Sequence, residues 1–318
     1  MTSTSTDRGG AAPLVGAAPP RGRSTLQRQR ARAGLVAVSP ALVLIVVFFV
    51  APLFLMVWMS FHNWPLLGSV QRFIGLQNYQ EVATDQTFID SVLFTLKYTA
   101  IVTPIQLVLG YALAITVRQK LRGQGLFRTF YFLPVVVGFA SGAYVFLVLV
   151  QPDSGVFDQV LEGLGITHGP TPWLTDPNLA LLTVILMITW KTIGTSIILL
   201  MVGMQSIPEE IGEAARVDGA HWWQREWFVI LPLMKPTIAL VLMLTITGSF
   251  LAFDQFFVLT HGGPNGSTLT IVMWIYTTAF VRYRLGYSAA LSIVLLVLLV
   301  VFSIIQIRAL RERSEASS

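Results

Sequence analysis

Six long apolar stretches dominate the pattern of hydrophobic and polar positions along the chain. They cover approximately residues 35–61, 91–117, 126–150, 179–203, 237–259 and 287–307. About twenty apolar residues cross a bilayer as a helix, because only a helix or a closed barrel satisfies every backbone polar group in hydrocarbon. A membrane barrel would require segments of alternating polarity, and the sequence has none. The pattern therefore predicts an all-α, polytopic membrane protein with six transmembrane helices.

The composition supports this interpretation and excludes several kinds of chemistry. Of the 318 residues, 54% are hydrophobic and 12% are charged, which is far more apolar material than one soluble core can bury. The chain has no cysteine, so disulfides, thiol nucleophiles and thiolate metal sites are excluded. The four histidines lie between the apolar stretches at no metal-binding spacing, and no stretch contains a Ser-His or paired-carboxylate arrangement. We therefore expect that the chain is not an enzyme.

Basic residues are divided unevenly among the segments that connect the stretches. The N-terminal tail, the second and fourth loops and the C-terminal tail hold 16 Lys and Arg residues, counting Arg128 at the edge of the third stretch with the second loop, whereas the first, third and fifth loops hold 3. Because cytoplasmic segments of membrane proteins carry the excess of Lys and Arg, both termini are predicted to be cytoplasmic. The net charge of +5 is then a sign of orientation rather than of nucleic-acid binding.

Three parts are expected along the chain. Residues 1–34 are rich in Ser, Thr, Gly, Pro and Arg and are predicted to form a disordered, basic cytoplasmic tail. Residues 35–310 are expected to form the six-helix transmembrane domain, and residues 311–318 a second cytoplasmic tail. The first apolar stretch is too long for a secretory signal and no small-residue cleavage site follows it, so we expect a retained helix.

The loop between the fourth and fifth stretches has the clearest internal pattern. Ser206 and Glu209 have the spacing of a capping box, which predicts a short helix through about Val217. Asp218 and Gly219 then interrupt this helix, since Gly tolerates a positive φ and Asp can cap the helix that follows. A second amphipathic run leads to the fifth stretch. The loop is therefore predicted to form a helix-turn-helix bracket at the cytoplasmic face.

Several short motifs in the chain occur together in one family. In the loop at residues 206–236 they are Glu213-Ala214-Ala215, Asp218-Gly219-Ala220, Ile230-Leu231-Pro232 and Pro236. Outside the loop they are the segments 73–79 (FIGLQNY), 128–134 (RTFYFLP) and 259–264 (LTHGGP). The loop resembles the EAA loop of binding-protein-dependent ABC importer permeases, and the other segments are similar to carbohydrate permeases of the maltose and glycerol-3-phosphate type.

This resemblance implies a type I ABC importer permease fold for residues 35–310. In the family, a short helix beginning near Glu213 docks into a cleft of a cytoplasmic ATP-binding subunit and transmits closure of the ATPase dimer to the spans. The expected coupling residues are Glu213, Ala214, Ala215, Asp218, Gly219, Ala220, Leu231 and Pro232. The alternative is an amphipathic loop that rests on the membrane surface through Trp222, Trp223 and Trp227.

The resemblance also implies a set of partners in the bacterial inner membrane. These are a second homologous permease subunit, a dimer of cytoplasmic ATP-binding subunits, an extracellular solute-binding protein and a sugar substrate, with no nucleic acid. ATP and Mg²⁺ are expected in the ATP-binding subunits and no cofactor in this chain, which lacks the phosphate-binding motif G-x-x-x-x-G-K-[ST].

Polar residues inside the apolar stretches are candidates for substrate contact. Lys191 lies near the centre of the fourth stretch, next to Trp190, and an intramembrane charge is costly enough to suggest a function. Sugars are bound by aromatic stacking and by hydrogen bonds to their hydroxyl groups. The expected substrate-binding residues are Trp190, Lys191, Thr195, Ser249, Gln255 and Ser141. For the small polar residues, helix packing is the alternative explanation.

A sugar importer is the leading functional hypothesis. A permease for glycerol-3-phosphate or another polyol phosphate would be expected to place several cations in its cavity. An ion-coupled secondary transporter would require intramembrane acids, and Asp254 is the only plausible one. Helical periodicity places Asp254 opposite Ser249, and an ion pair between Asp254 and Lys191 is a further hypothesis.

Overall fold

The computed structural model describes residues 25–68, 71–118, 124–152 and 154–315. It divides the chain into two compact units, residues 1–55 and 56–318. Most of the predicted N-terminal tail lies outside the described residues. The first helix begins at Thr25 and so contains the last ten residues of the predicted tail, and the last helix extends to Glu315.

The described part of the first unit is one helical segment, which is apolar from Val36 onward. Helix α1 (Thr25–Ile45) continues through a π-helical turn, η1 (Val46–Val50), into α2 (Ala51–Ser60), which crosses the boundary between the units. The span Val36–Ser60 has a mean hydropathy of 2.9, and its most apolar window buries no residue. Such a helix is suited to a lipid environment.

Three long helices form the frame of the second unit. They are α4 (Gln86–Arg118), α8 (Pro177–Gln205) and α15 (Leu285–Glu315), and each is long and apolar enough to cross a membrane. Asp176 caps α8 by accepting hydrogen bonds from the backbone N–H groups of Asn178 and Leu179, both at 2.9 Å. Within the described residues, four helices meet the criteria for a span, or six if each of two bent helix pairs is one span.

The third predicted span is broken. Helix α5 (Gln124–Val136) and helix α6 (Phe139–Leu149) meet at an angle of 110°, so the prediction of one continuous helix is wrong here. Pro134 lies in the last turn of α5 and cannot donate a backbone hydrogen bond, and Gly138 adopts an extended conformation at the start of α6. Proline and glycine together therefore account for the break.

The fifth predicted span ends early. Helix α12 (Lys235–Phe250) stops nine residues before the predicted limit, and α13 (Asp254–Leu259) begins after a short non-helical segment. The hydroxyl of Thr270 donates a hydrogen bond of 2.9 Å to the carbonyl of Ala252 in this segment. A residue distant in sequence thus satisfies the backbone where the helix is interrupted.

Short elements connect the long helices. Between α2 and α4 the chain forms two strands, β1 (His62–Asn63) and β2 (Arg72–Phe73), which pair antiparallel, and the short helix α3 (Gln77–Thr84). The others are α7 (Val156–Gly163), α9 (Glu209–Val217), α10 (Trp222–Arg225), η2 (Glu226–Ile230), α11 (Leu231–Leu233), α14 (Ile271–Tyr276) and η3 (Thr277–Val281). The apolar segment from α14 through η3 is too short to cross a bilayer and was not predicted.

The FIGLQNY segment folds against the end of α2. The buried amide of Asn78 donates hydrogen bonds to the carbonyls of Ser60 and His62, at 2.8 and 3.0 Å. Tyr79 shares a hydrogen bond of 2.7 Å with the Ser60 hydroxyl. Gly75 has a φ of +59°, which Gly adopts without a steric penalty. The motif therefore secures the turn that follows the first apolar helix.

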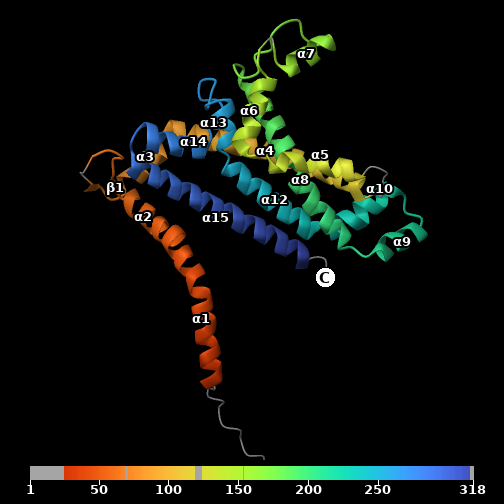
Figure 1. The fold of residues 1–318 in the computed structure, drawn as a ribbon, viewed down its shortest axis with the longest axis horizontal. Helices are drawn as coiled ribbons and strands as arrows, with labels where there is room; N and C mark the ends of the chain where they lie inside the picture. The colour runs from red at the N-terminus through yellow and green to blue at the C-terminus, as the bar shows by residue number, and fades with distance from the viewer. Residues whose placement is uncertain (1–24, 69–70, 119–123, 153, 316–318) are drawn as a thin grey trace, which may run out of the picture. The chain divides into compact units, whose positions relative to one another are not determined.

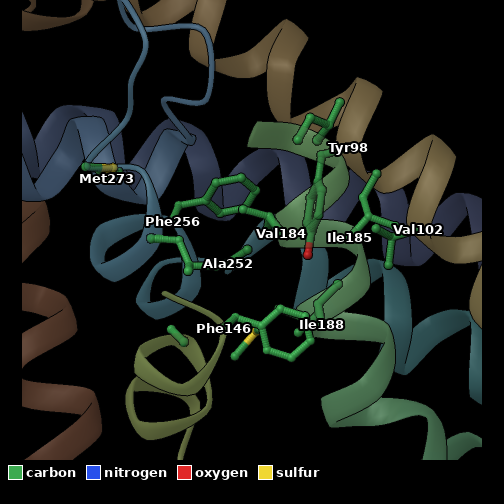
Figure 2. Packing of buried hydrophobic residues seen from close by; sticks show 13 residues of the cluster. Tyr98, Val102, Phe146, Val184, Ile185, Ile188, Ala252, Phe256 and Met273 are labelled. Atoms are coloured by element: carbon green, nitrogen blue, oxygen red, sulfur yellow. The ribbon is translucent and has the colours of Figure 1, made fainter. Parts of the chain in front are cut away.

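Helix α8 contributes to two of the three core clusters of the second unit. Figure 2 shows one cluster of this core, in which residues of α4, α6, α8 and α13 meet. The rings of Tyr98 and Phe256 contact edge to face with centroids 5.0 Å apart, and both side chains are fully buried. Small residues let the helices approach closely, as where Gly110 of α4 faces Ser196 of α8.

Gly194 of α8 tests this close packing. In Gly194→Ala the added Cβ would overlap the backbone carbonyl oxygen of Tyr131 in α5. We expect a loss of about 1 to 3 kcal/mol of stability. The temperature at which the detergent-solubilised protein aggregates should therefore fall. The matched control is Gly248→Ala in α12, where nothing lies within 4 Å of the new Cβ. Equal aggregation temperatures for the two variants would contradict the packing described.

Candidate functional site

A cavity of about 370 Å³ lies among α4, α8, α12 and the segment that joins α12 to α13. Its wall contains hydroxyl and amide side chains within a largely apolar frame. The polar lining residues are Tyr98, Gln106, Thr192, Thr195, Ser196, Thr245, Ser249, Asp254 and Gln255. A concave site of this kind, mostly apolar with a few placed polar groups, is typical of small-molecule binding.

Hydrogen bonds hold the amide groups of the wall. The Gln106 side-chain nitrogen donates to the hydroxyl of Thr192, which itself donates to the carbonyl of Ile188 at 2.7 Å. The Gln255 nitrogen lies 3.5 Å from the Tyr98 hydroxyl. Both Gln106 and Gln255 are buried, so these contacts limit the directions in which their remaining polar atoms can point.

The break after Phe250 brings Asp254 to the cavity. A continuous helix would place this residue opposite Ser249, and that expectation is wrong because the backbone is not helical between them. Among the described residues that line the cavity, Asp254 is the one acid, and there is no Lys, Arg or His. The wall therefore carries negative rather than positive charge.

Three of the six predicted substrate-binding residues line this cavity, and three do not. Thr195, Ser249 and Gln255 line it, whereas Trp190, Lys191 and Ser141 are elsewhere. Trp190 packs on Phe146 with ring centroids 5.7 Å apart, and Ser141 is exposed in the first turn of α6.

Lys191 makes its contacts within the protein. Its ammonium donates a hydrogen bond of 2.9 Å to the carbonyl of Val135 and lies 4.8 Å from the centre of the Phe139 ring. The one ion pair among the described residues joins Arg284 and Glu81, so the hypothesised pair of Lys191 with Asp254 does not form.

Two lining residues of α4 were missed from the sequence. Tyr98 and Gln106 lie eight residues apart and so face the same side of a helix. A glutamine in the middle of an apolar stretch was a signal that could have identified this face. Phe139 was also missed, because its place in the wall depends on the bend between α5 and α6.

The loop between α8 and α12 forms the predicted bracket of short helices. Every residue of α9 is described and none is buried, so Glu213 and Ala214 face outward. Its end is closed by two backbone hydrogen bonds, from Gly219 N–H to Arg216 and from Ala220 N–H to Ala215, at 3.2 and 3.0 Å. Gly219 has a φ of +83°, as the C-terminal residue of such a motif requires.

The capping of these short helices differs from the prediction. Ser206 ends α8, where its hydroxyl donates to the carbonyl of Gly203, and Pro208 precedes α9 without a side-chain cap. The helix that follows Asp218 is capped instead at His221, whose N–H donates to Gln224 at 2.8 Å. The capping-box spacing at Ser206 was therefore misleading, because the N-cap of α9 is Pro208, which has a fixed φ and no side chain that can accept a hydrogen bond.

The second half of the loop is attached to the helix bundle. Ile230 and Met234 are buried in a core cluster with α8 and α4, Leu231 is half-buried and Pro232 is exposed. The buried carboxylate of Glu226 accepts a hydrogen bond of 2.8 Å from the Tyr111 hydroxyl of α4. In Figure 1, α9 and α10 lie at the end of the second unit away from α13 and α14.

The family model described as "Binding-protein-dependent transport system inner membrane component" matches residues 87–313. This range is most of the chain and contains the cavity and the bracket. The chain therefore belongs to this family of inner membrane transport components, and with its apolar helices it is a multi-pass protein of the bacterial inner membrane.

Individual relatives include permease proteins of several transport systems. The chain is 36% identical to "Multiple sugar-binding transport system permease protein MsmF" of Streptococcus mutans, over 84% of this chain and 91% of that protein. It is 31% identical to "sn-glycerol-3-phosphate transport system permease protein UgpA" of Agrobacterium fabrum, over 87% of this chain and 94% of that protein.

Its fold is similar to a chain of a bacterial ABC transporter involved in the import of the acidic polysaccharide alginate. The TM-score is 0.79 at 21% identity, over 91% of this chain and 99% of the other.

Gly219 offers a test of the bracket geometry. In Gly219→Ala the left-handed conformation costs about 1 to 2 kcal/mol. Local opening should therefore increase roughly 5- to 30-fold, and tryptic cleavage after Arg216 should accelerate to a similar extent. The control is Gly212→Ala within α9, whose new Cβ makes only an ordinary contact with Arg225. Mass spectrometry of the purified chain during digestion measures the rate of cleavage after Arg216 in each variant. Equal rates in Gly219→Ala and Gly212→Ala would contradict the need for a left-handed conformation at residue 219.

Proposed function

We propose that this chain is the permease subunit of an ATP-driven, binding-protein-dependent importer of a neutral sugar. The observation that carries the proposal is α9, a helix with no buried residue in a loop otherwise attached to the bundle. An exposed, structured helix between two anchored segments is suited to a partner that must move the bundle. Membership in the family of binding-protein-dependent transport components supports this interpretation.

The proposed topology has six spans with both termini in the cytoplasm. Helices α5 and α6 then form one bent span, α12 begins another after the 71° bend that separates it from the segment Trp222–Leu233, and the bracket of α9 and α10 faces the cytoplasm. The distribution of Lys and Arg supports this orientation, because the bracket and both chain ends lie in segments rich in basic residues. The turn around α13 and α14 would face the outside.

The proposed assembly pairs this chain with a second homologous permease subunit. A dimer of ATP-binding subunits holds ATP and Mg²⁺ and receives α9 through Glu213, Ala214 and Ala215. An extracellular solute-binding protein delivers the sugar. Closure of the ATP-binding dimer moves the bracket, and because α12 runs from the bracket to the cavity, this movement changes which side of the membrane the cavity faces.

The lining of the cavity favours a neutral sugar over a phosphorylated polyol. Hydroxyl and amide groups can bond the hydroxyls of a sugar, whereas a phosphate would require cations that the described lining does not contain. Asp254 would repel an anion in addition. Glycerol-3-phosphate, the substrate named for the relative UgpA, remains the second candidate because that relative is 31% identical.

Glu213→Ala tests the role of α9. We expect the variant to reach the membrane in normal amount, because Glu213 is exposed and has no packing role. Sugar uptake should be lost, and less ATP-binding subunit should co-purify with the chain. The matched control is Glu162→Ala, which removes an exposed glutamate from the short helix α7. Wild-type uptake and co-purification in Glu213→Ala would contradict the coupling role.

Gln255→Leu tests the cavity as the substrate path. The change removes a hydrogen-bonding amide at similar volume, and the loss of one bond to the sugar is worth about 1 kcal/mol. We expect maximal uptake to fall about fivefold to tenfold, while the external half-saturation concentration, set by the solute-binding protein, stays unchanged. Uptake of radiolabelled sugar over a range of concentrations separates the two quantities. An unchanged maximal rate would exclude Gln255 from the path.

A further inference from the structure

We propose that Lys191 is a positioning residue that holds the bend between α5 and α6 and thereby sets Phe139 in the wall of the cavity. Its importance for transport rests on the proposed function, whereas its effect on the bend does not. The geometry assigns its ammonium to the protein backbone rather than to substrate.

The bend leaves backbone groups without helical partners. The last carbonyls of any helix have no donor within that helix, and inside a membrane water is not available to replace one. At the end of α5, the N–H of Val137 donates to the carbonyl of Pro134 at 3.2 Å. The carbonyl of Val135 accepts from the Lys191 ammonium at 2.9 Å. Lys191 thus supplies the donor that the broken helix lacks.

A cation is the appropriate group at this point. Aligned peptide dipoles give the C-terminal end of a helix a partial negative charge, so an ammonium there is electrostatically favourable. Lys191 is only 5% exposed, and a buried charge of this kind requires compensation. Two groups provide it, namely the Val135 carbonyl and the face of the Phe139 ring, 4.8 Å from the ammonium.

The surrounding helices leave little freedom for the lysine. Gly142 of α6 packs tightly on α8 beside the lysine, since an added Cβ would be 3.1 Å from Met187 and 4.0 Å from the lysine stem. One turn further along α8, Gly194 lies directly against the carbonyl of Tyr131, which is one turn before Val135 in α5. Helix α8 therefore contacts α5 at two successive turns, at Tyr131 through Gly194 and at Val135 through Lys191. At the second contact Lys191 also reaches Phe139 of α6.

The cavity is affected through one residue. Phe139 is the first residue of α6 and a lining residue, and its ring is also the one that the Lys191 ammonium faces. Lys191 itself does not line the cavity. A change at Lys191 should therefore alter the path through the position of α6, without removing a group that touches the sugar.

The bend can be measured directly by spin labels. Because the chain has no cysteine, Phe130→Cys in α5 and Val148→Cys in α6 create two unique labelling sites, both exposed. Electron paramagnetic resonance on the labelled full chain in lipid nanodiscs gives the distance between them. We expect a narrow distribution with Lys191 present, and a broadened or shifted one in Lys191→Met. Lys97→Met, the same change at an exposed lysine of α4, should leave the distribution unchanged.

Uptake then tests whether the bend acts through Phe139. Lys191→Met and Phe139→Leu should each lower maximal uptake about threefold, and the double variant should be no slower than the slower single variant. Additive losses would show that the two residues act separately and would overturn the route through Phe139. Identical label distances in wild type and Lys191→Met would overturn the positioning role.

The two proposals can fail separately. A wild-type chain that supports no sugar uptake would overturn the proposed function, yet the label distances would still decide whether Lys191 holds the bend. If Lys191→Met changes the label distances as expected but the uptake losses of Lys191→Met and Phe139→Leu are additive, Lys191 still holds the bend, and the proposed link from the bend to the cavity is overturned.

Discussion

Inside a bilayer the backbone has no water to bond, so every interruption of a helix must find a donor or acceptor within the protein. Two interruptions shape this molecule. At the first, between α5 and α6, the Lys191 ammonium bonds the carbonyl of Val135. At the second, after α12, the Thr270 hydroxyl bonds the carbonyl of Ala252. The cavity lies next to both, because Phe139 follows the first break and Asp254 and Gln255 follow the second. The chain therefore obtains a polar site in an apolar setting from the places where its helices stop.

Two helices join this site to the exposed bracket. Helix α12 begins at the bracket and ends at the cavity, and α4 carries both Tyr98 in the cavity wall and Tyr111, whose hydroxyl bonds Glu226 of the bracket. In the proposed mechanism these are the routes by which movement of α9 reaches the sugar. Both routes start from an anchored segment, since Ile230 and Met234 pack the end of the loop into the core.

The sequence was sufficient to predict those structural elements that are determined by residues close together in the chain. Long apolar stretches predicted the helical character of the chain, and the positive φ of Gly219 followed from its place between two short helices. The break after Phe250 was not predictable in this way, because no proline or glycine lies between Ser249 and Gln255, and its partner Thr270 is distant in sequence. The same limit applies to the candidate site. Ser249, Gln255 and Thr195 were found from their polarity, whereas Asp254 and Phe139 line the cavity only because of the breaks.

In the proposed mechanism this chain forms part of a sugar path driven by ATP in another subunit. The most direct test is sugar uptake into liposomes that contain the chain purified with its accompanying subunits, with the solute-binding protein outside and ATP inside. Uptake is expected to require both the enclosed ATP and the solute-binding protein. Uptake by the chain alone, independent of ATP and driven by an ion gradient, would contradict this mechanism and would identify the protein as a secondary transporter.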